Sequence, residues 1–285
     1  MKFYEDPACF YHLIKTCRVS FIYGYSECMV NFFPSREVLL TIAHFQVRWY
    51  GLLYVVAFWL GWFLLPKLAT LRNLLLTKDE ASRIAAWVAF GVIAGGHLGY
   101  VLLYEPAYYV VHPLEIFLLN QGGMSSHGGF IGVALTLCWL TRKPMGHPAG
   151  VPWVERFLTL ADILVVPVAF GLALGRVGNF INQELYPGYW ALAVAGADLF
   201  LGFVCWYFLK KDTLFTPGGC KKGYVAGVFL VGYGVIRFLN EFVRIDEWPH
   251  ILGLTYGQFL TVPIFLGGLW LVWKNSLKVK GWQPE

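Results

Sequence analysis

The sequence predicts an all-α membrane protein that crosses the bilayer about seven times. Of its 285 residues, 58% are hydrophobic and only 14% are charged, whereas a soluble domain carries about 25% charged residues. Crossing ~30 Å of hydrocarbon takes about 20 helical residues. The apolar runs are continuous rather than alternating, which excludes the strands of an outer-membrane barrel. They are Trp49–Pro66, Ile84–Tyr104, Ile116–Thr141, Ile163–Gly175, Leu199–Leu209, Gly223–Ile236 and Trp248–Trp273.

The distribution of basic residues predicts the orientation of the chain. Lysines and arginines follow every second apolar run, whereas the alternate loops at 106–126 and 182–190 contain none. Cytoplasmic loops are the ones enriched in these residues, so we expect the amino terminus outside and the carboxyl terminus in the cytoplasm. The net charge of +5 is modest and does not indicate a nucleic-acid partner. The basic loop residues are Lys67, Arg72, Lys78, Arg83, Arg142, Lys143, Arg156, Lys210, Lys211, Lys221, Lys222, Lys274, Lys278 and Lys280.

One membrane domain accounts for most of the chain. The expected division is an extracytoplasmic extension at 1–44, a seven-helix membrane domain at 45–275 and a cytoplasmic tail at 276–285. Three cysteines of the extension would face the outside, where one disulfide is possible and one thiol would be left over. These are Cys9, Cys17 and Cys28. No Cys-x-x-Cys pattern is present, and we expect no metal site.

Two further patterns predict local structure. Gly91, Gly95 and Gly99 are spaced four apart in the second run, and small residues at this spacing let helix backbones approach closely. The segment His112–Gln121 has apolar residues at helical spacing and ends in glycines. It predicts a short helix lying at the outer interface.

Polar residues of five predicted helices reach the same depth, in the outer leaflet. Charged groups within a span are costly, and their default interpretation is functional. Those of the first three helices are Arg48, Tyr50, His97 and His127; the fourth ends with Arg176, Asn179, Asn182 and Glu184; the sixth ends with Arg237, Asn240, Glu241 and Arg244.

These residues predict an anion pocket open to the outer leaflet. Arg237, Glu241 and Arg244 stand at i, i+4 and i+7 and share one helical face, which leaves net positive charge. Arg176 and Asn179 share a face in the same way. The planar guanidinium binds phosphate or carboxylate in a bidentate manner and stays charged in a low-dielectric site. An interhelical salt-bridge network is the alternative interpretation.

His127 is the most promising catalytic side chain. Gly128 and Gly129 follow it and remove side-chain bulk, so a ligand could reach the backbone N–H groups at the start of the helix. His97, His112 and His250 lack such surroundings, and we interpret them as structural. Among the acids, Asp198 has no visible partner in the sequence, and Asp162 is expected to cap or anchor the fourth helix.

At these residues the chain resembles the prolipoprotein diacylglyceryl transferases of bacterial inner membranes. The resemblance covers about 47–273, in order, and its motifs are long and polar. They are "VRWYGLLY", "GGHLGYVLLYEP", "GGMSSHGGFIG", "GRVGNFINQEL" and "GYGVIRFLNEFVR". The family has seven spans with the amino terminus outside, which agrees with the charge pattern.

The resemblance implies a specific reaction. The family transfers the diacylglyceryl group of phosphatidylglycerol to the lipobox cysteine of a preprolipoprotein, forming a thioether and releasing glycerol phosphate. By similarity His127 would be the base, Arg176 and Arg237 the phosphate binders, and Asn179 and Glu184 parts of the signature motif. Tyr50, Tyr233 and Glu241 also match functional positions, and we count Tyr50 and Tyr233 with the catalytic residues. The expected substrate-binding set is Asn179, Asn182, Glu184, Glu241, Arg244, Gly128 and Gly129, and we expect no cofactor.

Two departures from the family pattern leave alternatives open. After "NQELYPGYW" the chain passes directly into the next span, where family members have an extracytoplasmic head. His97 replaces an arginine that commonly follows two glycines in the second span. The alternatives are a related lipid-modifying enzyme with another acceptor and a non-catalytic phospholipid-binding paralogue.

Overall fold

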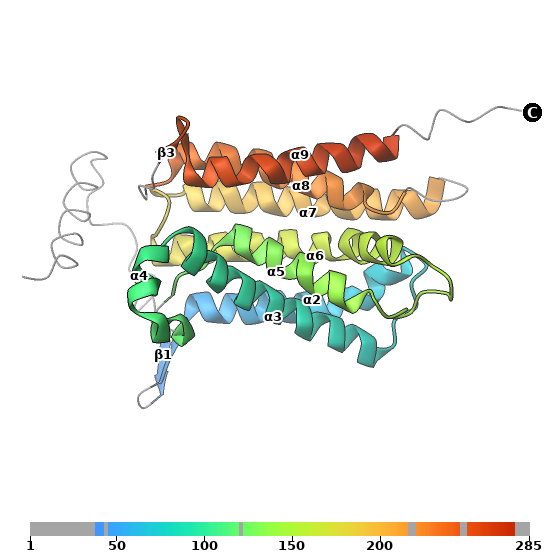
Figure 1. Ribbon diagram of the computed structural model, residues 1–285, viewed down its shortest axis with the longest axis horizontal. Helices are drawn as coiled ribbons and strands as arrows, with labels where there is room; N and C mark the ends of the chain where they lie inside the picture. The colour runs from blue at the N-terminus through green and yellow to red at the C-terminus, as the bar shows by residue number, and fades with distance from the viewer. Residues whose placement is uncertain (1–37, 43–44, 120–121, 216–220, 246–249, 277–285) are drawn as a thin grey trace, which may run out of the picture.

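The computed structural model describes residues 38–42, 45–119, 122–215, 221–245 and 250–276. Long helices run side by side along the molecule (Figure 1). Cys9, Cys17 and Cys28, and with them the possible disulfide, lie outside the described residues. The main helices are α2 (Trp49–Thr70), α3 (Lys78–Leu103), α5 (Ser126–Leu140), α6 (Trp153–Asn182), α7 (Trp190–Phe215), α8 (Tyr224–Asn240) and α9 (Tyr256–Ser276).

The described part confirms a helical membrane protein. Six of these helices, all except α5, are long and apolar enough to cross a membrane, and α5 is a shorter apolar helix. Large hydrophobic side chains such as Trp59 of α2 and Phe203 of α7 are more than half exposed, at 58% and 52%. Such exposure suits a surface that faces lipid tails. All seven predicted apolar runs correspond to helices.

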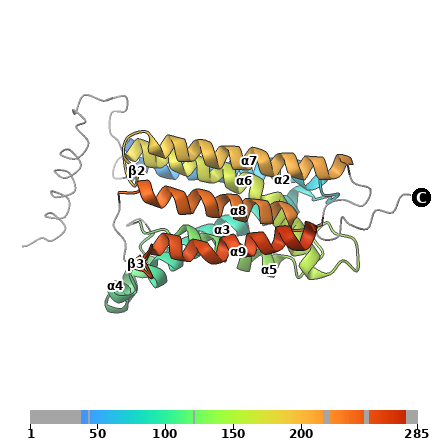
Figure 2. The same cartoon turned by 90° about the horizontal axis from the view of Figure 1, so that it is seen from above.

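The short elements gather at one end of the bundle, which we call the hairpin end (Figures 1 and 2). Helix α2 begins there and α9 ends at the opposite end, as an odd number of crossings requires. The short elements are the antiparallel strand pairs β1 (Val38–Ile42) with β2 (Phe45–Arg48) and β3 (His250–Ile251) with β4 (Leu254–Thr255), the helix α4 (Pro106–Val111), and the 3-10 helices η1 (Pro113–Phe117) and η3 (Glu241–Val243).

The third crossing helix is shorter than the apolar run that contains it. The run extends from Ile116 to Thr141, whereas α5 begins at Ser126, next to the predicted start at His127. Gly122 and Gly123 adopt φ of 93° and 76°, a left-handed conformation that ends regular helix. In the described part of the segment expected to form an interfacial helix, His112–Gln121, the structure has the 3-10 helix η1, preceded by α4. With 15 residues, α5 is about 22 Å long and does not span the full ~30 Å of hydrocarbon.

Glycines bring α3 and α5 into backbone contact, as their spacing predicted. A Cβ at Gly95 would lie 2.5 Å from the Gly128 carbonyl oxygen, and one at Gly99 would lie 2.5 Å from the Gly128 Cα. Gly91 faces Gly132 in the same way. The first turn of α5 is therefore fixed against α3, and His127 is held at a defined position.

Asp162 joins three segments at the end opposite the hairpin end. Its carboxylate accepts hydrogen bonds from Arg72 Nη2 and from the backbone N–H groups of Gly223 and Ala226, each at 2.8 Å. The side chain is buried, with 0% exposure. Asp162 therefore anchors its own helix, α6, to the start of α8 and to the connection after α2, and it does not cap α6, which begins at Trp153.

Replacing Asp162 by alanine is expected to lower the free energy of unfolding by about 3–5 kcal/mol, because Arg72 would keep a buried charge without this partner. The measurement is the melting temperature of the detergent-solubilised protein, which should fall by on the order of 10 °C. Asp79→Ala is the matched control, since Asp79 is exposed in the first turn of α3. Equal melting temperatures for the two variants would contradict the anchoring role.

Candidate functional site

The polar residues singled out by the sequence lie on helix ends at the hairpin end. His127 begins α5, Arg176 and Asn179 are in the last turns of α6, and Arg237 is in the last turn of α8. The start of α9 adds Thr261, and α7 contributes Asp198. The elements that carry the site are therefore the ones predicted, together with α7 and α9.

His127 is buried and is held by α9. Its Nε2 lies 3.1 Å from Thr261 Oγ1, and the Thr261 hydroxyl donates to the Gly257 carbonyl at 2.7 Å. Because that donation uses the only hydroxyl proton, the Thr261 oxygen accepts from His127 Nε2–H. The neutral ring then carries its lone pair on Nδ1, which is buried and has no hydrogen-bond partner among the described residues. Thr261 was missed by sequence reasoning, because one threonine in an apolar run gives no signal.

The glycines after His127 do not serve the purpose the sequence suggested. The backbone N–H of Gly128 donates to Ser125 Oγ at 3.2 Å, and that of Gly129 donates to the Ser125 carbonyl at 2.9 Å. Neither N–H is therefore free to bind an anion. Gly128 instead allows the contact with α3 described above. The neighbouring Ser126 accepts a hydrogen bond from the Tyr233 hydroxyl at 3.1 Å, which links α5 to α8.

The end of α8 forms a buried cluster of two arginines and one glutamate. Arg237 Nη1 donates to Glu241 and, at 3.2 Å, to Asn240 Oδ1. Arg244 Nε lies 3.8 Å from the same Glu241 carboxylate. The three side chains meet as predicted and leave one net positive charge. They do not lie on one α-helical face, because α8 ends at Asn240, Glu241 begins η3 and Arg244 is extended.

Gly257 of α9 lets this cluster pack against a helix backbone. A Cβ at Gly257 would lie 2.5 Å from Arg237 Nη2 and 2.7 Å from Glu241 Oε1. Any larger residue would push the ion pair away from α9. No pattern in the sequence pointed to Gly257, because the contact joins segments that are distant along the chain.

Arg176 has partners on α6 and α7. Its Nη1 donates to Asn179 Oδ1 at 3.3 Å, and Asn179 Nδ2 donates to Glu184 Oε1 at 3.0 Å. Its Nε lies 3.6 Å from Asp198 Oδ2. Asp198, which showed no partner in the sequence, therefore forms an ion pair with Arg176. Because Glu184 is exposed, Asp198 is the acid that mainly offsets the buried Arg176 charge.

Aromatic rings surround Arg176. The Tyr186 ring lies 5.7 Å from the guanidinium carbon, and the side chains of Tyr50 and Tyr233 lie near Arg176. Tyr50 packs against Gly178, where a Cβ would lie 2.6 Å from its ring. The predicted Tyr50 and Tyr233 thus belong to the same site as Arg176. Asn182 is not joined to it by any described hydrogen bond, and its buried Oδ1 has no partner among the described residues.

His97 and His112 have structural roles, as expected. The two ring nitrogens of His97 lie 3.0 Å from the Gly123 carbonyl oxygen and 2.9 Å from the Ile116 carbonyl oxygen. They hold the segment before α5 against α3. His112 contacts the Tyr108 carbonyl of its own helix at 3.1 Å.

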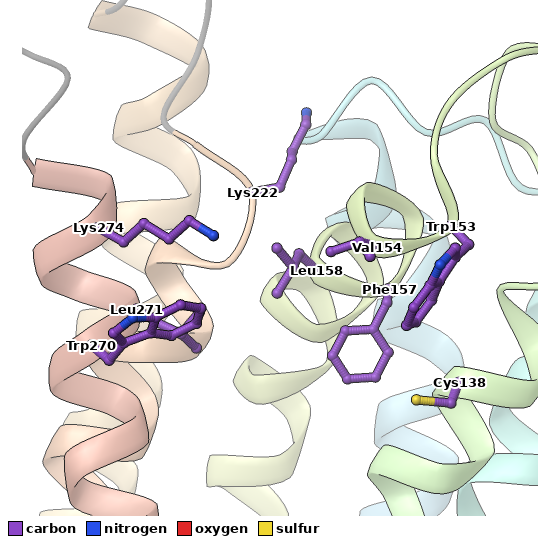
Figure 3. Close-up of a pocket in the computed structure, with 9 residues that line it drawn as sticks. All are labelled: Cys138, Trp153, Val154, Phe157, Leu158, Lys222, Trp270, Leu271 and Lys274. Carbon is purple, nitrogen blue, oxygen red and sulfur yellow. The ribbon is translucent and has the colours of Figure 1, made fainter.

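A cavity of about 260 Å³ lies elsewhere, near the end opposite the hairpin end (Figure 3). Phe157, Trp270 and Cys138 contribute to its walls, and Lys222 and Lys274 stand beside it. None of its lining residues belongs to the His127 and Arg176 region. This cavity is therefore separate from the polar site.

Fold and site together define a polytopic helical membrane protein with a buried histidine, arginines and acids at one end. A family model described as prolipoprotein diacylglyceryl transferase matches residues 37–274. The chain belongs to this family. Similar proteins, each named phosphatidylglycerol–prolipoprotein diacylglyceryl transferase, occur in several bacteria. The protein of Polaromonas naphthalenivorans is 36% identical over 279 residues, covering 85% of this chain and 96% of the relative. That of Bordetella avium is 37% identical over 271 residues, covering 85% and 95%.

Proposed function

We propose that this chain transfers the diacylglyceryl group of phosphatidylglycerol to the lipobox cysteine thiol of a preprolipoprotein. The reaction forms a thioether and releases glycerol phosphate. Family membership and the names of the similar proteins support the activity. The structural observation that carries the proposal is that His127, Arg176 and Arg237, from three different helices, lie at one end of a membrane bundle, with His127 and Arg237 buried and Arg176 partly buried.

The residues suit each step of this chemistry. A cysteine thiol has a pKa of about 8.5, so a base increases the fraction of reactive thiolate. His127 Nδ1 accepts the thiol proton, and the sulfur attacks the glyceryl carbon that is bonded to the phosphate oxygen. As the C–S bond forms, the C–O bond breaks and its electron pair leaves with the glycerol phosphate. Arg176 and Arg237 stabilise the charge that develops on the departing phosphate.

The remaining predicted residues position these groups. Glu241 and Asn240 orient Arg237, and Asn179, backed by Glu184, orients Arg176. We assign Arg244, Tyr50, Tyr233 and Asn182 to the lining of the substrate site. Gly128 and Gly129 belong to the frame that fixes His127 rather than to the surface that binds the lipid.

An apolar groove of about 290 Å³ lies beside Arg176 and suits an acyl chain of the donor. Helix α6 forms its floor with Ala173 and Val177, and Leu60 of α2 and Leu199 of α7 stand on either side. Val177 lies five residues before Asn182, the last residue of α6, and Phe170 lies twelve residues before it. At 1.5 Å per residue the groove covers roughly 10 Å of helix, leading from the level of Arg176 toward the bundle centre.

The site is assigned to the outer leaflet of the bacterial inner membrane. The basic loops predicted to be cytoplasmic follow the ends of α2, α5, α7 and α9, which lie away from the hairpin end. The amino-terminal side would then be outside and the carboxyl-terminal side in the cytoplasm. The acceptor cysteine of a preprolipoprotein emerges on the same side as His127 in this orientation.

The short connection from α6 to α7 favours one alternative, a lipid-modifying enzyme with another acceptor. Only residues 183–189 separate the two helices, so this connection is too short to form an extracytoplasmic head over the site. A more open site would admit acceptors other than a preprolipoprotein. A third possibility is a paralogue that binds phospholipid without turnover.

The test is transfer by purified protein in mixed micelles of phosphatidylglycerol and detergent. A lipobox peptide should gain the mass of one diacylglyceryl group, and glycerol phosphate should appear in equal amount. Peptides with cysteine replaced by serine or alanine are the controls. Release of glycerol phosphate without modified peptide would support another acceptor. If folded protein binds phosphatidylglycerol and gives neither product, the transferase proposal is wrong.

A further inference from the structure

Asp198 is a buried acid at the site to which the proposed reaction gives no role. It lies in the third turn of α7, one helix away from the proposed phosphate-binding Arg176 of α6. Its side chain is 1% exposed. An acid at this depth within a membrane helix is costly, so its contacts are informative.

The ion pair between Arg176 and Asp198 leaves polar atoms unsatisfied on both sides. Arg176 Nε and Asp198 Oδ2 are 3.6 Å apart, which exceeds the 2.7–3.2 Å typical of an N–H···O hydrogen bond. Arg176 Nε and both carboxylate oxygens of Asp198 are buried and have no hydrogen-bond partner among the described residues. One buried donor, Arg176 Nε–H, and two buried acceptors, the Asp198 oxygens, therefore lie close together without a hydrogen bond between them.

A hydroxyl group matches this arrangement. Its oxygen can accept from Arg176 Nε–H while its proton is donated to the Asp198 carboxylate. A phosphate or carboxylate could accept from Nε but would repel Asp198, and an ammonium group would repel Arg176. The pair is thus selective for an alcohol among common lipid head-group functions.

The position of the Arg176–Asp198 pair, beside the proposed phosphate-binding groups of Arg176, indicates which alcohol it binds. Phosphatidylglycerol carries two free hydroxyls on the glycerol of its head group, a few bonds from the phosphate. A phosphate bound at the Nη groups of Arg176 leaves the Nε edge, and Asp198 beside it, for one of these hydroxyls. The apolar groove of α2, α6 and α7 also includes Ala195 and Leu199, within one turn of Asp198.

We propose that Asp198 and Arg176 Nε form the subsite that recognises a head-group hydroxyl of the donor lipid. The inference rests on the proposed function, because it takes Arg176 as the phosphate binder. It goes further by giving the enzyme a means to prefer phosphatidylglycerol over lipids that carry the same charge without a hydroxyl. Tyr186 lies over Arg176, so the head group reaches the pair when the 183–189 connection moves.

The experiment compares two donors in the peptide-transfer assay with wild type, Asp198→Ala and Asp198→Asn. Phosphatidylglycerol has the hydroxyls, and phosphatidylethanol with the same acyl chains has the same charge and lacks them. Wild type should use phosphatidylglycerol with a kcat/KM about 10- to 100-fold higher, the range of one hydrogen bond to a charged group. In Asp198→Ala this ratio should fall to within about threefold of unity. Asp198→Asn keeps an acceptor oxygen and should show an intermediate ratio.

Several outcomes would overturn the subsite. A wild-type enzyme that uses both lipids equally has no hydroxyl recognition. An equal loss with both lipids in Asp198→Ala would mean that Asp198 only holds Arg176 in place. An equal loss accompanied by a shifted pH profile would mean that Asp198 handles the thiol proton. Failure of wild type to transfer from either lipid would instead refute the proposed function, so the two failures are distinguishable. Elution of each variant as a monodisperse peak in detergent checks folding.

Discussion

Replacing His127 by glutamine is expected to slow diacylglyceryl transfer by about 100- to 10,000-fold, the contribution of general base catalysis. Glutamine retains a hydrogen-bond donor toward Thr261 but cannot take up the thiol proton. The measurement is the single-turnover rate at saturating phosphatidylglycerol, with the modified peptide followed by mass spectrometry. The deficit should shrink as pH rises toward the thiol pKa of about 8.5, since solvent then supplies thiolate.

Thr261 provides the matched control for this prediction. Thr261→Val removes the acceptor of His127 Nε2–H and should lower the rate by about tenfold, the cost of one buried hydrogen bond. Thr261→Ser keeps the hydroxyl and should restore most of the rate. A His127→Gln enzyme with a rate within threefold of wild type would refute His127 as the base, and equal rates for the two Thr261 variants would refute the tautomer assignment.

Replacing Arg176 by glutamine is expected to lower kcat by about 100- to 1,000-fold, the range seen when one preorganised group that stabilises developing charge is removed. Arg176→Lys keeps the charge but loses the planar fork, so it should recover only part of the activity. Because the arginine stabilises the departing phosphate more than the bound lipid, kcat should fall more than KM rises.

The control for Arg176 is Arg83→Gln, which removes an exposed positive charge of α3. Activity should stay near wild type, because Arg83 lies at the opposite end of the bundle from the site. If Arg176→Gln raises KM alone and leaves kcat unchanged, Arg176 contributes to lipid binding only.

The sequence predicted the helices well, because an apolar run of membrane length has few other stable conformations in lipid. Hydropathy alone did not locate the start of α5, because the apolar run from Ile116 to Thr141 continues past it and hydropathy does not register conformation. The boundary was indicated by Gly122 and Gly123, which end the expected interfacial segment and lie just before α5.

The site was only partly predictable. Arg237, Glu241 and Arg244 could be grouped because helical spacing predicted that their side chains meet, and they do meet although Glu241 and Arg244 lie beyond the end of α8. The pairing of Asp198 with Arg176 and that of Thr261 with His127 join different helices, and no local rule determines such contacts. Gly128 was assigned to ligand access, whereas its contact with α3 has a packing role. The roles of His127, Arg176 and Arg237 in catalysis stay predictions.

The shortness of α5 bears on how an acceptor is selected. A helix of 15 residues is about 22 Å long, whereas the hydrocarbon core is ~30 Å thick. If its last residue reaches the far side of the core, its first residue lies several ångströms below the near surface. His127, its second residue, would then meet a thiol held at that depth. An acceptor would be chosen by how far its cysteine stands from the end of its own apolar segment. The enzyme would select acceptors by the depth of the cysteine in the membrane. Thickening the bilayer with longer acyl chains would change the depth of the cysteine relative to His127.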